Sequence, residues 1–232
     1  VFLVNDPYTM DAGNQMADWG IVYPVFCKGE HVLWVANKAH QQDTGGGVPG
    51  GYNPGALDVY AEGLRIPPIR LFEGGKERKD VFNLIMTNVR IPGAQRGDLM
   101  SMIGAARVGE RRLKAIYDLY GADTMTIFIE DLLNYGEFIM REEIAALPDG
   151  TYRSEILGGE GSVPIICDLT IKGDEMVVDF RDSGPQVPVY VNSPIANTTS
   201  SVYMALMTSV GKRIQYRCGG CYRPVSLLTT PG

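Results

Sequence analysis

IVYPVFCKGEHVLWVAN, residues 21–37, holds two runs of β-branched and aromatic residues on either side of the break CKGE. Such runs, separated by a break of hairpin size, predict two antiparallel strands. Upstream, VFLVNDPY at residues 1–8 has the composition of a further strand that is already under way. Residues 1–60 are therefore predicted to form a strand-rich, glycine-rich region.

Two long helical patterns follow further along the chain. DLMSMIGAARVGERRLKAIYDLYG (98–121) and MTIFIEDLLNYGEFIMREEIAAL (125–147) each repeat apolar residues on one helical face, and PDG ends the second. Two helices joined by a short break predict a pair packed on a sheet or on each other. In the first helix we expect Met102, Ala106, Leu113, Ile116 and Tyr120 to share the buried face.

The last third of the chain returns to strand patterns. TYRSEIL (151–157), VPIICDLTI (163–171) and EMVVDFRD (175–182) are predicted strands, with KGD between the last two as a hairpin turn. SPIANTTSSVYMALMTSV (193–210) is predicted to be a helix. The chain then closes on LLTTPG, where we expect no further element.

These elements predict an α+β fold: a strand-rich region with a glycine loop, a long helical pair, and a second antiparallel β region with one helix. The corresponding division is residues 1–97, 98–148 and 149–232. Within the first part, residues 61–97 are rich in proline and glycine and are expected to be a linker-like surface segment. We also expect the chain to be a fragment of one longer subunit.

Composition limits the partners. The 232 residues carry 21 basic and 27 acidic side chains, a net charge of −6, which argues against nucleic acid or an anionic membrane surface. No apolar run approaches the roughly 18 residues of a membrane-spanning helix. Four cysteines are too few for a disulfide scaffold and favour a cytoplasmic setting. Cys218 and Cys221, in CGGC, are interpreted as an incidental pair, with half a zinc site or a redox pair as the alternatives.

The strongest chemical signal is ANKAHQQDTGGGVPGG, residues 36–51, in which His40 precedes Asp43 by three positions. Asp6 and Asp18 lie in preceding turns, and mixed imidazole and carboxylate ligands suit zinc, manganese or iron. Residues 1–60 hold six acidic residues but two lysines and no arginine, which also favours a cation. The alternative is that His40 caps a turn while Asp43 accepts hydrogen bonds from the glycine loop.

Other common catalytic motifs are missing from the sequence. Neither EGGKER nor VGKRI has the spacing of a phosphate-binding loop, so no residues here show where ATP would bind. There is no G-x-S-x-G elbow, and the chain has two histidines, so a nucleophilic triad is not expected.

Several longer phrases occur in an order that resembles the hydantoinase B/oxoprolinase family, which includes the large subunits of acetone and acetophenone carboxylases. The phrases that carry this resemblance are NDPY (5–8), PVF (24–26), ANKAHQQDTGGGVPGG (36–51), YAEGLRIPPIRL (60–71), NVRIPGAQRGDL (88–99), DFRDSGPQV (179–187) and NSPIANTTSSVYMAL (192–206). They cover nearly the whole chain, and the family subunits are longer at both ends.

The resemblance implies an ATP-dependent, cytoplasmic hetero-oligomer. A partner similar to hydantoinase A would bind ATP and phosphorylate a small-molecule substrate, and a subunit of the present type would complete the reaction. The favoured reaction is carboxylation of a ketone, which would make the enzyme a ligase. The alternatives are hydrolysis of a cyclic amide, as in hydantoinase and 5-oxoprolinase, and a non-catalytic assembly role.

The resemblance also implies a divalent metal, manganese, iron or zinc, held by Asp18, His40 and a third residue. The family has histidine at that third position, and here it is Gln15 or, if one residue is inserted, Asn14. The metal would polarise a carbonyl or enolate oxygen. Asp43 would orient His40 or act as a base.

Two further groups are expected to serve the substrate. Gly45, Gly46 and Gly47 would let the backbone approach the reacting group closely. Arg223 would bind a carboxylate or phosphate, or else form a structural ion pair. Asn5 and Asp6 are expected to fix a turn.

Overall fold

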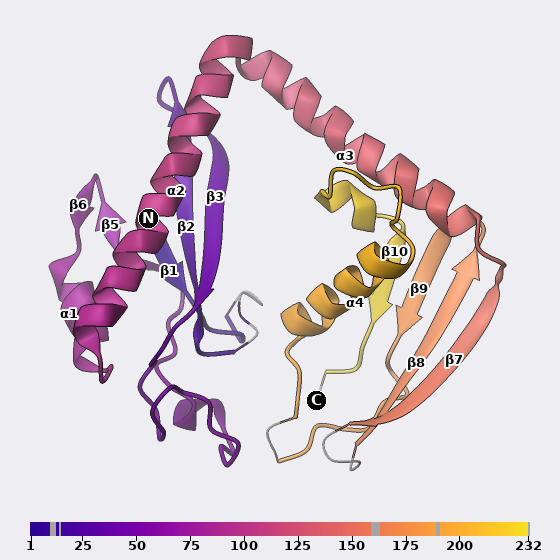
Figure 1. Cartoon of the computed structure of the whole chain (residues 1–232), viewed down its shortest axis with the longest axis horizontal. Coiled ribbons are helices and arrows are strands. Elements are labelled where there is room, and N and C mark those ends of the chain that lie inside the picture. Colours follow the sequence, from indigo (N-terminus) through magenta and orange to yellow (C-terminus); the bar gives the residue numbers. More distant parts are fainter. Residues whose placement is uncertain (10–12, 14, 159–162, 189–190, 232) are drawn as a thin grey trace. The chain divides into compact units, whose positions relative to one another are not determined.

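The computed structural model describes residues 1–9, 13, 15–158, 163–188 and 191–231, and its α+β class agrees with the prediction. The chain groups into two compact units (Figure 1). Unit 1 comprises Val1–Gly121 with Ser193–Asn197, and unit 2 comprises Ala122–Asn192 with Thr198–Gly232. The division at residues 97 and 148, which followed the predicted elements, stays a prediction.

Unit 1 is built on a sheet of order β3-β2-β1-β4. Its strands are β1 (Phe2–Val4), β2 (Asp18–Cys27), β3 (Glu30–His40) and β4 (Ile69–Arg70). The predicted hairpin is confirmed, because β2 and β3 pair antiparallel along their whole length. Lys28 and Gly29 form the turn with φ values of 52° and 88°, the left-handed conformations that a two-residue hairpin turn requires.

The hairpin contains one irregularity. From the open end, the pairs run from Asp18 opposite His40 to Val25 opposite Leu33, and the next pair is Phe26 opposite His31. Val32 is therefore an extra residue on β3, and the register shifts by one at this bulge.

Residues 61–97 are not the linker-like surface segment that was expected. They contain β4, β5 (Phe72–Glu73), β6 (Lys76–Glu77) and α1 (Lys79–Thr87), with the short 3-10 helix η1 (Val59–Ala61) just before them. Val81, Phe82 and Ile85 of α1 are buried, since the short apolar run VFNLI has helical spacing despite its glycine and proline neighbours.

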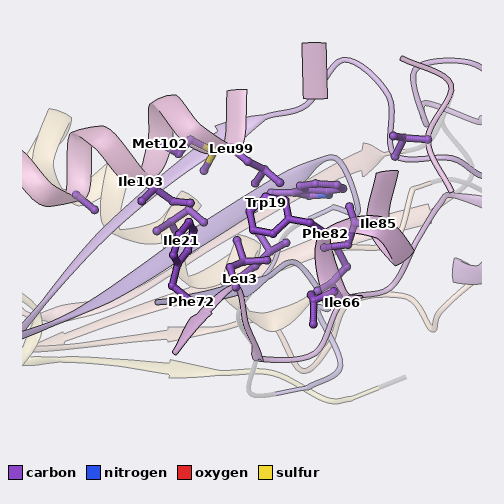
Figure 2. Close-up of a cluster of buried hydrophobic side chains, with 14 residues drawn as sticks. Leu3, Trp19, Ile21, Ile66, Phe72, Phe82, Ile85, Leu99, Met102 and Ile103 are labelled. Atoms are coloured by element: carbon purple, nitrogen blue, oxygen red, sulfur yellow. The ribbon is translucent and has the colours of Figure 1, made fainter. Parts of the chain in front are cut away.

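Helix α2 (Pro92–Tyr120) covers the core of unit 1 and packs against β2 and β3. Figure 2 shows the core, in which Leu3, Trp19 and Ile21 of the sheet meet Phe82 of α1 and the α2 side chains. Burying one such large apolar side chain contributes about 1.5–3 kcal/mol.

The buried face of α2 was predicted in part. Met102 and Ala106 are buried as expected, but Ile116 and Tyr120 are 39% and 58% exposed. Near the carboxyl end Tyr117 is the buried residue instead. The reason is that the sheet contacts are made by the amino-terminal half of this helix, which supplies its members of the core cluster.

Unit 2 has a sheet of order β10-β9-β8-β7. Its elements are α3 (Ala122–Ala145), β7 (Gly150–Gly158), β8 (Val163–Lys172), β9 (Glu175–Asp179), α4 (Ile195–Ser209, which belongs to this unit from Thr198 onward), the 3-10 helix η2 (Gly219–Tyr222) and β10 (Val225–Leu228) (Figure 1). β7, β8 and β9 are antiparallel, as predicted. β10 was not predicted and pairs parallel with β9, because α4 and η2 provide the crossover that a parallel pair needs.

Side chains from both helices of unit 2 pack with its sheet. Met140 and Ile144 of α3 join Val202 and Leu206 of α4 in a buried cluster with the inner faces of β8 and β9. None of the helices in the described part of the chain combines the length and the apolar character that crossing a membrane requires.

Candidate functional site

Asp18 and His40 lie directly opposite each other at the open end of the β2–β3 hairpin. Successive side chains of a strand point to opposite faces. Trp19 and Ala39, the neighbours of these two residues, face the core of unit 1, so Asp18 and His40 project from the other face of the sheet. Lys38, two positions before His40, shares that outer face. The sheet itself thus brings together the two residues that the sequence proposed as metal ligands.

Three side-chain atoms converge at this point. His40 Nδ1 lies 2.9 Å from Asp18 Oδ1, and the Gln15 amide lies 3.2 Å from each of them. Gln15, one of the two candidates for the third position, thus lies beside both residues, while Asn14 lies outside the described residues and the choice between the two stays a prediction. Lys38 Nζ is 3.3 Å from the other carboxylate oxygen of Asp18.

The charge of Asp18 is stabilised by these neighbours. Burial alone would raise the pKa of its carboxyl, but hydrogen bonds from His40 and Gln15 and the charge of Lys38 lower the pKa overall. The side chain of Asp18 is only 11% exposed, whereas that of His40 is 57% exposed. A carboxylate that accepts from Nδ1 of a histidine favours the tautomer with its proton there, which leaves the lone pair on Nε2.

The same three side chains fit a divalent cation. Ligand atoms about 2.1 Å from a metal and at right angles to one another are about 3.0 Å apart, close to the three distances observed. Gln15 would have to present its oxygen, a rotation that leaves the side-chain shape unchanged. In the described part of the chain, no three His, Cys, Asp or Glu residues gather as a metal cluster, so a cation here would depend on the amide of Gln15.

Asp43 belongs to a separate group of hydrogen bonds, centred on Arg90. The role of orienting His40, which was expected of Asp43, falls to Asp18, which lies 2.9 Å from His40 Nδ1. Arg90 holds Asp43 twice, from its guanidinium to Oδ1 and from its backbone N–H to Oδ2, both at 2.7 Å. The amides of Gly45 and Gly50 also donate to this carboxylate. Burial opposes ionisation of Asp43, but these donors lower its pKa overall.

Arg90 was missed in the sequence. Its guanidinium also donates to the carbonyl oxygens of Gly45, Gly46 and Val48, so one side chain ties the glycine loop together. It lies 47 positions after Asp43, and no spacing rule links the two. The available signal was its place in NVRIPGAQRGDL, one of the phrases that carry the family resemblance.

The glycines of the loop approach the backbone of their own unit closely. Gly45 and Gly46 have φ values near +79° and +78°, which glycine adopts without strain. A Cβ at Gly45 would lie 2.5 Å from the carbonyl oxygen of Asn88, and one at Gly46 would lie 2.8 Å from that of Ala61. Gly47 donates its amide to Ala61 as well. These contacts account for the glycines structurally, and their role toward substrate stays a prediction.

Asn5 fixes the segment after β1. Its side-chain amide donates to the carbonyl oxygens of Met16 and Leu64 and accepts from the backbone N–H of Ile66, while only 1% of the residue is exposed. The expectation that Asn5 secures this turn is therefore confirmed.

Asp6 pairs with Arg65, whose guanidinium lies 2.8 Å from Oδ2. Together with the Arg90 pair, this changes the meaning of the acidic excess in residues 1–60. Two of these carboxylates are neutralised by arginines from residues 61–97, so counting charges within one segment overstated the need for a cation.

Arg223 lies in unit 2 and forms a structural ion pair, one of the two roles expected for it. Its guanidinium lies 3.2 Å from Glu137 and donates to the side-chain oxygen of Asn134 at 2.9 Å, and both partners belong to α3. Binding of a substrate anion by Arg223 stays a prediction.

Comparison with known proteins identifies relatives along the whole chain. The model of the hydantoinase B/oxoprolinase family matches residues 1–232. The caprolactamase subunit beta of Pseudomonas jessenii is 42% identical over 228 residues, which cover 96% of this chain and 39% of that protein. The acetophenone carboxylase delta subunit of Aromatoleum aromaticum is 31% identical over 209 residues, which cover 85% of this chain and 31% of that protein.

The fold has a counterpart among solved structures. The crystal structure of the ATP-dependent caprolactamase from Pseudomonas jessenii superposes with a TM-score of 0.89 and 40% sequence identity, over 99% of this chain and 40% of that one. The chain thus spans about two-fifths of the length of the caprolactamase proteins it matches, 39% and 40%.

Proposed function

This chain belongs to the hydantoinase B/oxoprolinase family, and we propose that it is part of the subunit of an ATP-dependent enzyme that hydrolyses a cyclic amide. The observation that carries the proposal is the convergence of Gln15, Asp18 and His40 within 2.9–3.2 Å on the outer face of the sheet. The 42% identity to a caprolactamase subunit supports a cyclic amide as substrate. The relatives thereby favour the hydrolase, whereas the sequence motifs favoured carboxylation.

His40 is the proposed base. Asp18 accepts from Nδ1, orients the ring and stabilises the positive charge that forms when Nε2 takes up a proton. Because 57% of the His40 side chain is exposed, a water molecule can reach the imidazole, lose a proton to Nε2 and attack the activated amide carbon. Lys38, beside Asp18, helps to keep that carboxylate ionised, and its charge would stabilise the anionic oxygen that develops on attack.

A divalent cation is part of the proposal as an alternative arrangement of the same residues. Gln15, Asp18 and His40 would hold it, and when bound it would polarise the substrate oxygen as a Lewis acid. With Nδ1 of His40 and Oδ1 of Asp18 both directed to the cation, Lys38 would still neutralise the second oxygen of Asp18.

The glycine loop is proposed to border the substrate. It is fixed by Arg90 and Asp43, and Gly46 and Gly47 are exposed. A loop whose conformation is already fixed can border the reacting group without rearranging during the reaction.

The second candidate is carboxylation of a ketone, which the 31% identity to an acetophenone carboxylase subunit supports. The same site would then stabilise an enolate rather than activate water. In both cases we propose that ATP binds to a separate subunit similar to hydantoinase A, within a cytoplasmic hetero-oligomer.

The test measures ADP formation by the intact complex with either a lactam or a ketone plus bicarbonate. We expect ADP formation to depend on the lactam and to be accompanied by the ring-opened amino acid. Dependence on ketone and bicarbonate, with no response to lactams, would establish the carboxylase instead.

His40→Ala tests the site, and His31→Ala is its matched control because His31 lies on the same strand at the other end of the hairpin. We expect the first variant to lose at least about a hundredfold in turnover, the lower range for a general base, and the second to retain turnover. Unchanged turnover in an intact His40→Ala complex would favour the non-catalytic assembly role.

Metal analysis by mass spectrometry of the same samples tests the cation. Gln15→His supplies the imidazole that the family has at this position and is expected to raise the metal content. Metal retained by His40→Ala at the level of the unaltered complex would rule out this site as its ligand set.

A further inference from the structure

Cys218 and Cys221 lie together at the start of η2 in unit 2. Their sulfur atoms are 4.0 Å apart, and both cysteines are free thiols. Cys218 is half-buried, whereas Cys221 is 0% exposed. Because a disulfide needs its sulfurs about 2.05 Å apart, rotation of these side chains must close only a short gap.

Cys218 and Cys221 pack directly against helix α3. A Cβ at Gly136 would lie 2.5 Å from the sulfur of Cys218 and 3.0 Å from that of Cys221, so both sulfurs contact the helix where it has no side chain. The thiol of Cys218 also donates to the carbonyl oxygen of Leu132. A Cβ at Gly220 would overlap the carbonyl of Leu133, so the turn between the cysteines lies equally close to the helix. The two sulfurs are thus held side by side by packing.

We propose that Cys218 and Cys221 form a reversible dithiol–disulfide site that exchanges with a small-molecule disulfide. The site is independent of the reaction proposed above, and it lies entirely within unit 2. It differs from the incidental pair favoured by the sequence, because Gly136 of α3 leaves space in which both sulfurs pack side by side against the helix.

The difference in exposure between Cys218 and Cys221 determines which thiol reacts first. The thiolate of Cys218, the accessible member, attacks one sulfur of the small disulfide and releases one thiolate. The thiolate of Cys221 then attacks the Cys218 sulfur and displaces the second. One S–S bond is broken and one is formed, two electrons pass to the small disulfide, and the two cysteine protons end on the released thiols.

Burial raises the pKa of the Cys221 thiol. This residue is therefore a poor first nucleophile, but it is well placed for the second, intramolecular step.

A metal is a weaker explanation of the pair. Within the described ranges, no third His, Cys, Asp or Glu joins these two cysteines to make a metal cluster. Zinc in proteins is usually bound by four ligands, so two thiolates alone leave its coordination incomplete.

The test equilibrates the intact protein in glutathione buffers of graded redox ratio and then quenches it with acid. Free thiols receive one alkylating tag, disulfides are reduced, and the released thiols receive a second tag before peptide mass spectrometry. We expect Cys218 and Cys221 to change tags together at one common ratio. Digestion without reduction should give a peptide lighter by two hydrogen atoms.

Two variants complete the design. In Cys218→Ser we expect Cys221 to keep the first tag at every ratio, because its partner is gone and it is buried. Cys167→Ser is the matched control, since Cys167 is half-buried in the same unit and its loss should leave the common midpoint unchanged.

Three results on the unaltered protein would overturn the proposal, whether or not the variants fold. The first is that both cysteines keep the first tag even in fully oxidised glutathione. The second is a stable glutathione adduct on Cys218. The third, seen when the native protein is alkylated without the acid quench, is protection of both thiols until a chelator is added, which would indicate a metal.

Discussion

Replacing Arg90 by alanine tests whether this one side chain holds the glycine loop. The variant loses the bond from the guanidinium to Asp43 Oδ1 at 2.7 Å and the bond to the carbonyl of Gly46 at 2.8 Å. It retains the bond from the backbone N–H of residue 90 to Asp43 Oδ2, because that donor is not part of the side chain.

The loss of unfolding free energy in Arg90→Ala depends on which partners of the guanidinium are left unpaired. A hydrogen bond to a charged group contributes about 1.5–3 kcal/mol, and removing one partner of a buried ion pair costs about 3–5 kcal/mol. Arg90 is 41% exposed, and Asp43 keeps three backbone N–H donors, so water and these donors recover part of the loss. We therefore expect the free energy of unfolding of unit 1 to fall by about 2 kcal/mol.

The assay is urea unfolding of the unaltered protein, Arg90→Ala and Arg90→Lys. Lysine keeps the charge but lacks the planar fork, so Arg90→Lys should lie between the other two. The pKa of Asp43 is lower in the folded chain than the ordinary value of 3.8 for an aspartic acid side chain. The stabilisation is therefore fully present above that value and is lost as the pH falls through the folded pKa. The difference in unfolding free energy between the unaltered protein and Arg90→Ala should therefore become smaller as the pH falls through the folded pKa of Asp43.

A difference in unfolding free energy below about 0.5 kcal/mol at pH 7, the range of ordinary surface substitutions, would show that the Arg90 side chain does not hold the loop. A difference that stays constant as Asp43 becomes protonated would also contradict this prediction, because the loss would then not involve the carboxylate.

Three further substitutions test the packing. Gly104→Ala on α2, where an added Cβ meets nothing within 4 Å, should stabilise the protein by up to about 1 kcal/mol. Gly136→Ala on α3 should destabilise the protein by about 1–3 kcal/mol, because the added Cβ would clash with two sulfurs. Thermal unfolding compares the two variants. Asn5→Ala removes three hydrogen bonds to backbone groups, of which the Met16 carbonyl keeps a second donor in Trp19. It should cost about 3 kcal/mol in urea unfolding, and a cost near zero would mean that water replaces the amide. Ile103→Ala empties a fully buried position in the core and should cost about 2–5 kcal/mol by the same measurement, while a value below 1 kcal/mol would show that the core collapses around it.

Much of the fold was predictable because local patterns agree with the final structure. The β2–β3 hairpin and the helices α2 and α3 follow from composition and helical period over long segments. The short α1 and the parallel strand β10 were missed for a common reason. Each has few residues, and its partners lie far away in the chain, so neither shows enough repeats for a period to be recognised.

The candidate site was predictable only in part. The pairing of Asp18 with His40 came from family resemblance, and it is realised by a strand register that no local rule provides. The closeness of the Gln15 amide to both Asp18 and His40 could not be read from the sequence. The pairing of Asp43 with Arg90 joins residues 47 positions apart, which a sequence without aligned relatives cannot connect.

Because of the bulge at Val32, β3 has one more residue than β2 between the turn and the open end of the hairpin. With the turn at Lys28–Gly29 and regular pairing, Asp18 would face Ala39, so the extra residue is what places His40 opposite it. A chain that lost Val32 could pair regularly from the turn onward and still bring the same two side chains together. A residue inserted into β3 has no such compensation. The one-residue bulge already keeps Asp18 opposite His40, so the insertion would need a second register shift. We expect this hairpin to tolerate shortening at Val32, with the site retained in a metal-binding or turnover assay, and to lose the site on lengthening by one residue.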